Sequence, residues 1–137
     1  MENIKEFFDR DQFARHCGIE LLSVSPGHAI TRMTVQPYHL NGYRRVQGGA
    51  LFTLADFAFA AAVNAHGTVA VAINVNITFI KAVTAGTLQA EAREVALNPK
   101  LGSYTINITD AENALVAVFQ GLAYRKSESV EAALQKS

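Results

Sequence analysis

The sequence predicts an α+β domain in which an antiparallel sheet wraps around one central helix. The first observation is the segment 50–64, which is rich in Ala and Leu, lacks Pro and is apolar nearly all round. That pattern is typical of a helix enclosed by other elements. The second observation is that the apolar period changes to two from Val69 onward, and three more strand candidates follow between turn residues. Neighbouring strands with few helices favour an antiparallel sheet.

Ahead of the central helix, the sequence predicts a short helix, two strands and a loop. Apolar side chains recur at helical spacing within residues 3–15, namely Ile4, Phe7, Phe8 and Ala14. Strands are expected at 19–25 and 28–35, joined by a Ser-Pro-Gly turn signal. A loop over residues 37–49 then leads to the central helix.

After the central helix, the sequence predicts four consecutive strands. Gly67 ends the helix, because glycine is the usual residue in the left-handed C-terminal position. The first of these strands is expected to have one fully apolar face: Val69, Val71, Ile73, Val75, Ile77 and Phe79. Further strands are expected at 87–96, 103–109 and 114–125. The tail, residues 128–137, is expected to form at most a frayed C-terminal helix.

Composition and charge exclude several classes of protein. The 137 residues fit one domain, 1–137, and 50% of them are hydrophobic, which excludes a disordered chain. Because the formal net charge is zero, no general attraction to nucleic acid or to an anionic membrane is expected. The N-terminus lacks an apolar signal core, and the longest apolar run is too short for a membrane span. We therefore expect a soluble cytoplasmic protein without nucleic-acid or membrane partners.

Asp56 is the most informative residue for function. In the predicted helix, Thr53 is the only other polar side chain before Asn64. Burial of an unpaired carboxylate is costly, so a purely structural sequence would rarely place one there. One interpretation is a general base or nucleophile whose pKa is tuned by apolar surroundings. The alternative is an Asp that is hydrogen-bonded to a neighbouring helix end or hydroxyl.

Gln47, Gly48 and Gly49 stand where the central helix begins. The first backbone N–H groups of a helix have no internal partners, and the helix dipole adds partial positive charge there. Paired glycines leave those groups uncovered, so that a carbonyl oxygen or an anion can approach closely. Such a helix start could serve as an oxyanion hole. The alternative is a plain helix N-terminus with a tight turn.

Three more polar residues are candidates for substrate contact. Asn41 could hydrogen-bond a substrate or an attacking water, or simply form an Asn-Gly turn. His39 could add a polar contact, or be a solvated loop residue. Asn74 could contact a ligand, or pair across the sheet. No metal-ligand spacing, nucleophile elbow, Walker loop or dinucleotide fingerprint occurs, so no metal or cofactor is expected.

Spacing along the helix constrains how these residues could act together. Gly48 and Asp56 are eight residues apart, which is about 12 Å along a helix axis. One chain could hardly place both against the same small carbonyl group. If both act on it, Asp56 is expected to come from a second subunit, with the site at the interface of a homodimer or of a dimer of dimers.

One segment resembles a known family. The residues HLNGYRRVQGGALFTLADFAFAAAVN, 39–64, resemble the H-L-N…H-G-G…L-F-x-L-A-D-x-A motif of the hotdog-fold acyl-CoA thioesterases, and look closest to the phenylacetyl-CoA thioesterase branch. The segments 73–83 and 119–126 are similar to the first strand after the helix and to the last strand of that family. One departure is Gln47, where the family commonly has His.

The resemblance implies a hotdog fold and a dimeric site that hydrolyses acyl-CoA thioesters. Residue by residue, it places the catalytic acid on Asp56, as general base or nucleophile, and the thioester-polarising N–H on Gly48. The positioning amide falls on Asn41, and Gln47, Gly49, His39 and Asn74 complete the expected substrate contacts.

Other functions are weighed against hydrolysis. One alternative is a hotdog protein that binds acyl thioesters without hydrolysing them. Gln47 supports this alternative, because Gln cannot titrate near neutral pH. A dehydratase of this fold would require a His paired with an acid for proton transfer at carbon, and the central helix motif contains no His. A purely structural oligomer would leave Asp56 unexplained.

Overall fold

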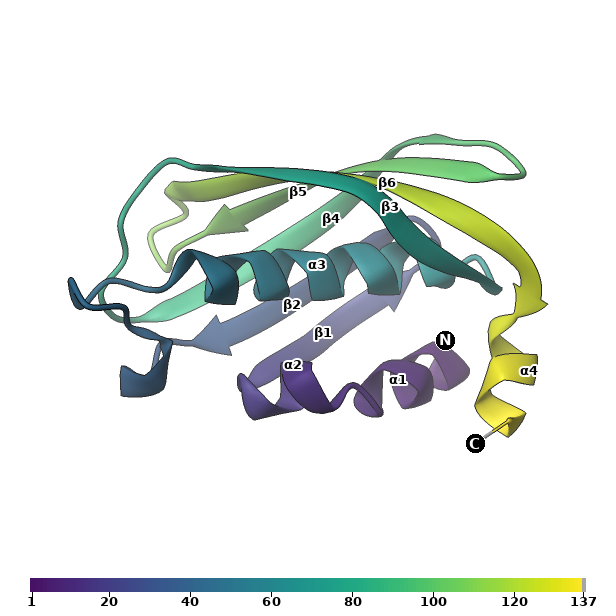
Figure 1. The fold of residues 1–137 in the computed structure, drawn as a ribbon, viewed down its shortest axis with the longest axis horizontal. Coiled ribbons are helices and arrows are strands. Elements are labelled where there is room, and N and C mark those ends of the chain that lie inside the picture. The colour runs from purple at the N-terminus through teal and green to yellow at the C-terminus, as the bar shows by residue number, and fades with distance from the viewer. Residues whose placement is uncertain (137) are drawn as a thin grey trace.

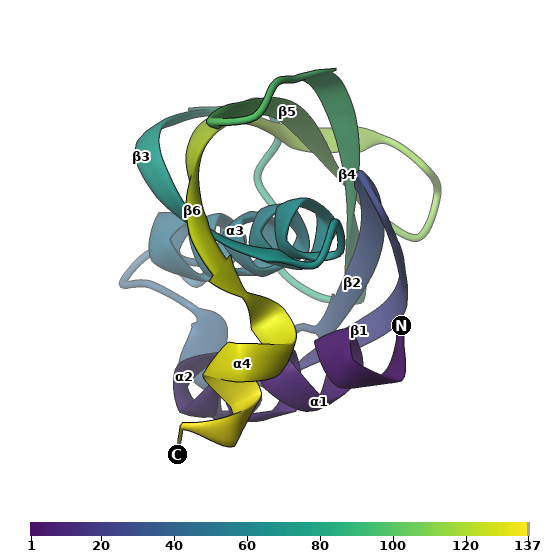
Figure 2. The same cartoon turned by 90° about the vertical axis from the view of Figure 1, so that its right-hand side faces the viewer.

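The computed structural model describes residues 1–136 and confirms the predicted α+β class. Six antiparallel strands form one sheet in the order β1-β2-β4-β5-β6-β3. Figures 1 and 2 show the sheet curling around helix α3, while α1, α2 and α4 lie on its open side. Among residues 1–136, no helix has the length and apolar character needed to cross a membrane.

The element bounds follow the sequence expectations closely over most of the chain. The strands are β1 Ile19–Ser25, β2 His28–Thr34, β3 Thr68–Phe79, β4 Thr87–Leu97, β5 Leu101–Thr109 and β6 Leu115–Ser129. The helices are α1 Glu2–Asp9, α2 Gln12–His16, α3 Gly48–Asn64 and α4 Val130–Gln135, with a short 3-10 turn at Pro37–His39.

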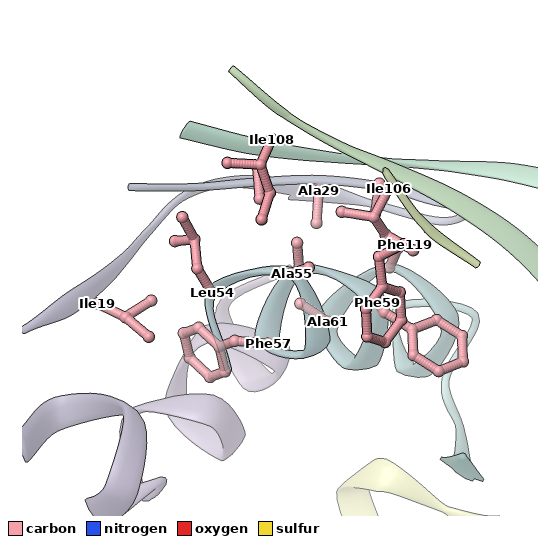
Figure 3. Close-up of a cluster of buried hydrophobic side chains, with 14 of the residues drawn as sticks. Ile19, Ala29, Leu54, Ala55, Phe57, Phe59, Ala61, Ile106, Ile108 and Phe119 are labelled. Atoms are coloured by element: carbon pink, nitrogen blue, oxygen red, sulfur yellow. The ribbon is translucent and has the colours of Figure 1, made fainter. Parts of the chain in front are cut away.

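Helix α3 is the centre of the core. It contacts all six strands, and more than half of its residues are buried. Figure 3 shows its Leu54 and Phe59 among side chains from the sheet, with Phe57 directed to the opposite side. Alanines such as Ala55 and Ala58 are fully buried and let the strands approach closely. The helix is therefore held in one position by packing on nearly every side.

The prediction of a single N-terminal helix over 3–15 is wrong, because the helix is interrupted at Arg10 and Asp11. Arg10 is the C-cap of α1, and Asp11 is the N-cap of α2. The Asp11 carboxylate accepts a hydrogen bond from Ala14 N at 3.0 Å, an arrangement that competes with a continuous helix. Buried Ile4, Phe8 and Ala14 still face the core, so the expected apolar face is kept across the break.

The tail also differs from its prediction over 128–137. Strand β6 continues to Ser129, and α4 begins only at Val130. The Ser129 hydroxyl caps α4 by accepting from Ala132 N, and Val130 is fully buried. The last residue of the predicted helix, 137, lies outside the described residues.

The predicted apolar face of β3 is wrong, because a bulge interrupts the alternation. The register with β6 shifts between Ala72 and Asn74. Val75 and Ile77, after the shift, pack against the core, whereas Val71 and Ile73 are 40% and 55% exposed. Phe79 is the last residue of the strand and is 54% exposed, an exposure that the bulge does not explain. An extra residue in a bulge turns the following side chains to the other face. Since β3 is an edge strand, its exposed apolar side chains lie along an unpaired edge.

A Gly121→Ala substitution is expected to lower the free energy of unfolding by about 1–3 kcal/mol, as overpacking does. A Cβ at Gly121 would lie 2.7 Å from Phe59 Cε2, and Phe59 is only 1% exposed. Its ring is held against Tyr104 and Phe119, so it has little room to move. Chemical denaturation measures the change. Gly42→Ala is the matched control, because a Cβ there would meet nothing within 4 Å, and equal stability of the two variants would contradict this packing.

Candidate active site

The N-terminus of α3 presents two unpaired backbone N–H groups. Gln47 is the N-cap, and its carbonyl accepts from Ala50 N and Leu51 N. Within the described chain, the N–H groups of Gly48 and Gly49 have no acceptor. The helix begins at Gly48, two residues before the predicted start. These N–H groups and the helix dipole make this end a favourable place for a partially negative oxygen.

The backbone around this helix start is fixed on both sides. Gln47 N donates to the His39 carbonyl, and Val46 N donates to the Val83 carbonyl, both at 2.8 Å. A Cβ at Gly48 would lie 2.9 Å from Phe79 Cζ, so a side chain at position 48 would have to displace this ring. A cavity of about 400 Å³ lies here, lined by residues that include Asn41, Gly48 and Phe79.

Asn41 forms the expected turn and also faces this cavity. Its side-chain oxygen accepts from Tyr43 N at 2.9 Å and from Arg45 N at 3.2 Å. Among residues 1–136, its amide NH₂ has no acceptor. Because the oxygen is already engaged, the free part of this side chain is a hydrogen-bond donor only. That donor suits a carbonyl oxygen of a ligand.

Asp56 lies two turns further along α3, on the wall of a different cavity. This cavity, of about 340 Å³, also has Thr53, Phe52 and Phe13 among its lining residues. The Asp56 carboxylate is half-buried and has no hydrogen-bond or ion-pair partner in the described part of the chain. Burial raises the pKa of this carboxyl above its ordinary value, and the negative charge of Asp11 raises it further. The structural alternative, a hydrogen-bonded Asp, has no partner here to support it.

A larger cavity, which is mostly apolar, shares part of its wall with the cavity of Asp56. It measures about 880 Å³, and Phe13, Phe52 and Thr53 line both this cavity and that of Asp56. Gln47 and Gly49 lie on its wall, together with Tyr38. Sequence reasoning missed Phe13, Tyr38 and Phe52, because an aromatic residue in a loop or on a helix carries no local signal for a cavity wall.

The remaining candidates occupy different surroundings. His39 is buried, with Nδ1 accepting from Gln36 N at 2.9 Å and Nε2 donating to the Cys17 carbonyl at 2.7 Å. Both ring nitrogens are engaged, so His39 lines the large cavity without a free polar atom. Asn74 lines a separate cavity with Asn76 and Gln120. A single chain thus groups Gln47, Gly49 and His39, but not Asn74.

Sequence comparison identifies related proteins. Residues 45–117 match the thioesterase superfamily. A putative esterase of Archaeoglobus fulgidus is 38% identical over 130 residues, covering 93% of this chain and 84% of that protein. The acyl-coenzyme A thioesterase PaaI of Escherichia coli is 38% identical over 125 residues, covering 90% and 89%.

Solved structures agree with the sequence comparison. The PaaI protein from the phenylacetic acid degradation operon of Escherichia coli superposes with a TM-score of 0.90 at 36% identity, covering 93% of this chain and 94% of that one. A mutant of the phenylacetic acid degradation protein PaaI from Thermus thermophilus gives 0.80 at 34% identity, covering 83% and 98%. The sheet wrapped around α3 is therefore the expected hotdog fold, which is confirmed.

Asp56→Asn is expected to raise the free energy of unfolding at pH 7. A carboxyl whose pKa is raised by folding contributes stability at low pH and loses it as the pH rises through its native pKa. Asn removes this loss, so the gain should vanish below about pH 3, where the carboxyl is protonated in both states. Denaturation between pH 3 and pH 7 measures it.

Asp110→Asn is the opposite control for that measurement. The hydrogen bond from Lys81 and that from Ala114 N hold the pKa of Asp110 below its ordinary value. Its charged form therefore stabilises the fold above the ordinary carboxyl range, and Asn should lower stability at pH 7. A loss of stability in both variants would contradict the unpaired, unfavourable environment described for Asp56.

Proposed function

This chain belongs to the thioesterase superfamily, and on that basis we propose that it hydrolyses acyl-CoA thioesters to a carboxylic acid and CoA. The name of the Escherichia coli relative supports the substrate class. The observation that carries the proposal is the half-buried, partnerless carboxylate of Asp56 on the same helix whose N-terminus presents free N–H groups. Together they supply a proton acceptor and a site for a developing oxyanion.

The thioester carbonyl oxygen is bound at the start of α3. Gly48 N–H donates to it, and the helix dipole favours the negative charge that develops there. The free NH₂ of Asn41 is the second donor, since its oxygen is already held by Tyr43 N and Arg45 N. Asn41 is thereby assigned to the carbonyl rather than to the attacking water, because activating a water requires an acceptor.

Asp56 acts as the general base in this proposal. Its carboxylate takes a proton from water while the water oxygen forms a bond to the acyl carbon, and the carbonyl π electrons move to the oxygen at Gly48. Collapse of this intermediate re-forms the carbonyl and breaks the C–S bond. The thiolate of CoA leaves and takes up the proton held by Asp56, which restores the carboxylate. A raised pKa makes Asp56 a better proton acceptor than an ordinary carboxylate.

The large apolar cavity is assigned to the acyl group. Its wall residues Phe13, Phe52 and Thr53 also line the Asp56 cavity, so an acyl chain there has its carbonyl end near the base. Such a cavity, lined mainly by apolar and aromatic side chains, is typical of small-molecule sites. Gln47 lies on the wall of this cavity and is exposed. Its contribution is limited to hydrogen bonding, because its amide does not titrate.

The complete site is proposed to form between two subunits. Within one chain, Gly48 and Asp56 line different cavities, about two turns apart along α3. Strand β3 has an unpaired edge and exposed Val71 and Ile73, with exposed Ile80 directly after the strand, which favours pairing with a second copy. We assign Gly48 and Asn41 of one subunit and Asp56 of the other to each site, in a homodimer or a dimer of dimers.

Asp56→Asn is expected to lower kcat by about 10²–10⁴-fold, the usual contribution of a general base. Thiol release from acyl-CoAs with aromatic, short and medium chains measures it. The parental rate should rise with pH through the pKa of Asp56, above the ordinary carboxyl range, because only the ionised form accepts a proton. The Asn variant should lose this acid limb while it still binds acyl-CoA.

Two results would contradict the catalytic assignment. Unchanged turnover in Asp56→Asn would exclude Asp56 as the base. Binding of acyl-CoA with no turnover in the parent protein would instead support the non-hydrolytic acyl-thioester-binding alternative. Glu91→Gln serves as the control for a lost carboxylate outside the site, and it should keep the parental rate. Glu91 pairs with His28 and Arg93 and lines none of the cavities described here.

A further inference from the structure

Asp11 and Asp56 are two carboxylates that line the same cavity. Asp56 reaches it from α3, and Asp11 reaches it from the break between α1 and α2. Among the described residues that line this cavity, no other side chain titrates or carries a charge. The rest of the lining is apolar except for Thr53, whose hydroxyl donates to the Gly49 carbonyl at 2.8 Å.

The position of Asp11 is fixed by the local backbone and by packing. One carboxylate oxygen accepts from Ala14 N at 3.0 Å, and the Asp11 carbonyl accepts from Arg15 N. Ala14 is buried, and the rings of Phe8 and Phe57 meet edge to face with centroids 5.6 Å apart. These contacts hold the α1–α2 segment against α3. The hydrogen bond from Ala14 N and the packing of Phe8 on Phe57 therefore keep Asp11 at the cavity that Asp56 lines.

The other charged and titratable groups nearby belong to adjacent cavities. One of these, which Asp11 also lines, has the charged residues Lys5, Asp9, Arg15 and Glu20 from α1, α2 and β1. The large apolar cavity has the titratable residues His16, Cys17, Tyr38 and His39. No ion pair joins Asp11 to a cation among residues 1–136. Its negative charge therefore remains available to act on Asp56.

We propose that Asp11 is a positioning residue of the active site, whose carboxylate faces Asp56 across one cavity and strengthens Asp56 as a proton acceptor. This inference rests on the proposed role of Asp56 as general base. When Asp56 takes the proton from water, a charged pair becomes one charge and one neutral acid. The repulsion between the two carboxylates is then relieved, so the negative charge of Asp11 favours this step.

The test replaces Asp11 by Asn, which removes the charge but keeps an oxygen that caps α2. The acid limb of the pH–rate profile should move to lower pH by roughly half a unit or more, within the range that nearby charges produce. The titration of the Asp56 carboxyl, followed by NMR with Asp56→Asn to assign the signal, should move in the same direction. High salt should reduce both shifts, because Asp11 is exposed.

Asp9→Asn is the matched control, since Asp9 lies two residues away but lines only the adjacent cavity. It should leave both midpoints in place. Equal midpoints in Asp11→Asn and the parent, or equal shifts in the Asp9 and Asp11 variants, would overturn the proposal. The NMR titration separates this result from failure of the proposed function. If Asp56→Asn stays active while Asp11→Asn still lowers the pKa of Asp56, only the catalytic role of Asp56 fails.

Discussion

The enclosure of α3 by the curled sheet is the constraint on which the rest of the structure depends. Packing on nearly every side fixes the helix, so its N-terminal N–H groups and the carboxylate of Asp56 are fixed relative to each other. Among the described residues, the polar groups that α3 presents to these cavities are the N–H groups of its first turn and the side chains of Thr53 and Asp56. In our proposal, the chemistry takes place at these groups.

In our proposal, stability and function make opposite demands on Asp56. A half-buried carboxylate without a partner weakens the fold near neutral pH, and the same surroundings make it a stronger base. The extensive apolar core around α3 offsets the loss. In our proposal, Asp11 adds to the effect by facing Asp56 with a second negative charge, while its other task is to cap α2.

Sequence patterns predicted the parts of the fold that depend on local chemistry, and they indicated the candidate site residues that the proposal uses. Asp56 and Gly48 stood out because a charge in an apolar helix and paired glycines at a helix start are conspicuous in the chain itself. The bulge near Ala72 had no such signal, since it depends on the pairing of β3 with β6. The break at Asp11 was missed because the apolar spacing continues across it. Phe13 and Tyr38 line a cavity only through tertiary packing, which local spacing does not encode.

The most direct test of this account mixes two inactive proteins, Asp56→Asn and Gly48→Val, under conditions that exchange subunits. Valine at 48 would collide with Phe79 and block the carbonyl site. If each site combines Gly48 of one subunit with Asp56 of the other, mixed dimers hold one intact site. Roughly a quarter of the parental activity should then return at random equal mixing, since half the dimers are mixed and one of their two sites works. No recovery, with mixed dimers demonstrated by mass spectrometry, would contradict the shared site.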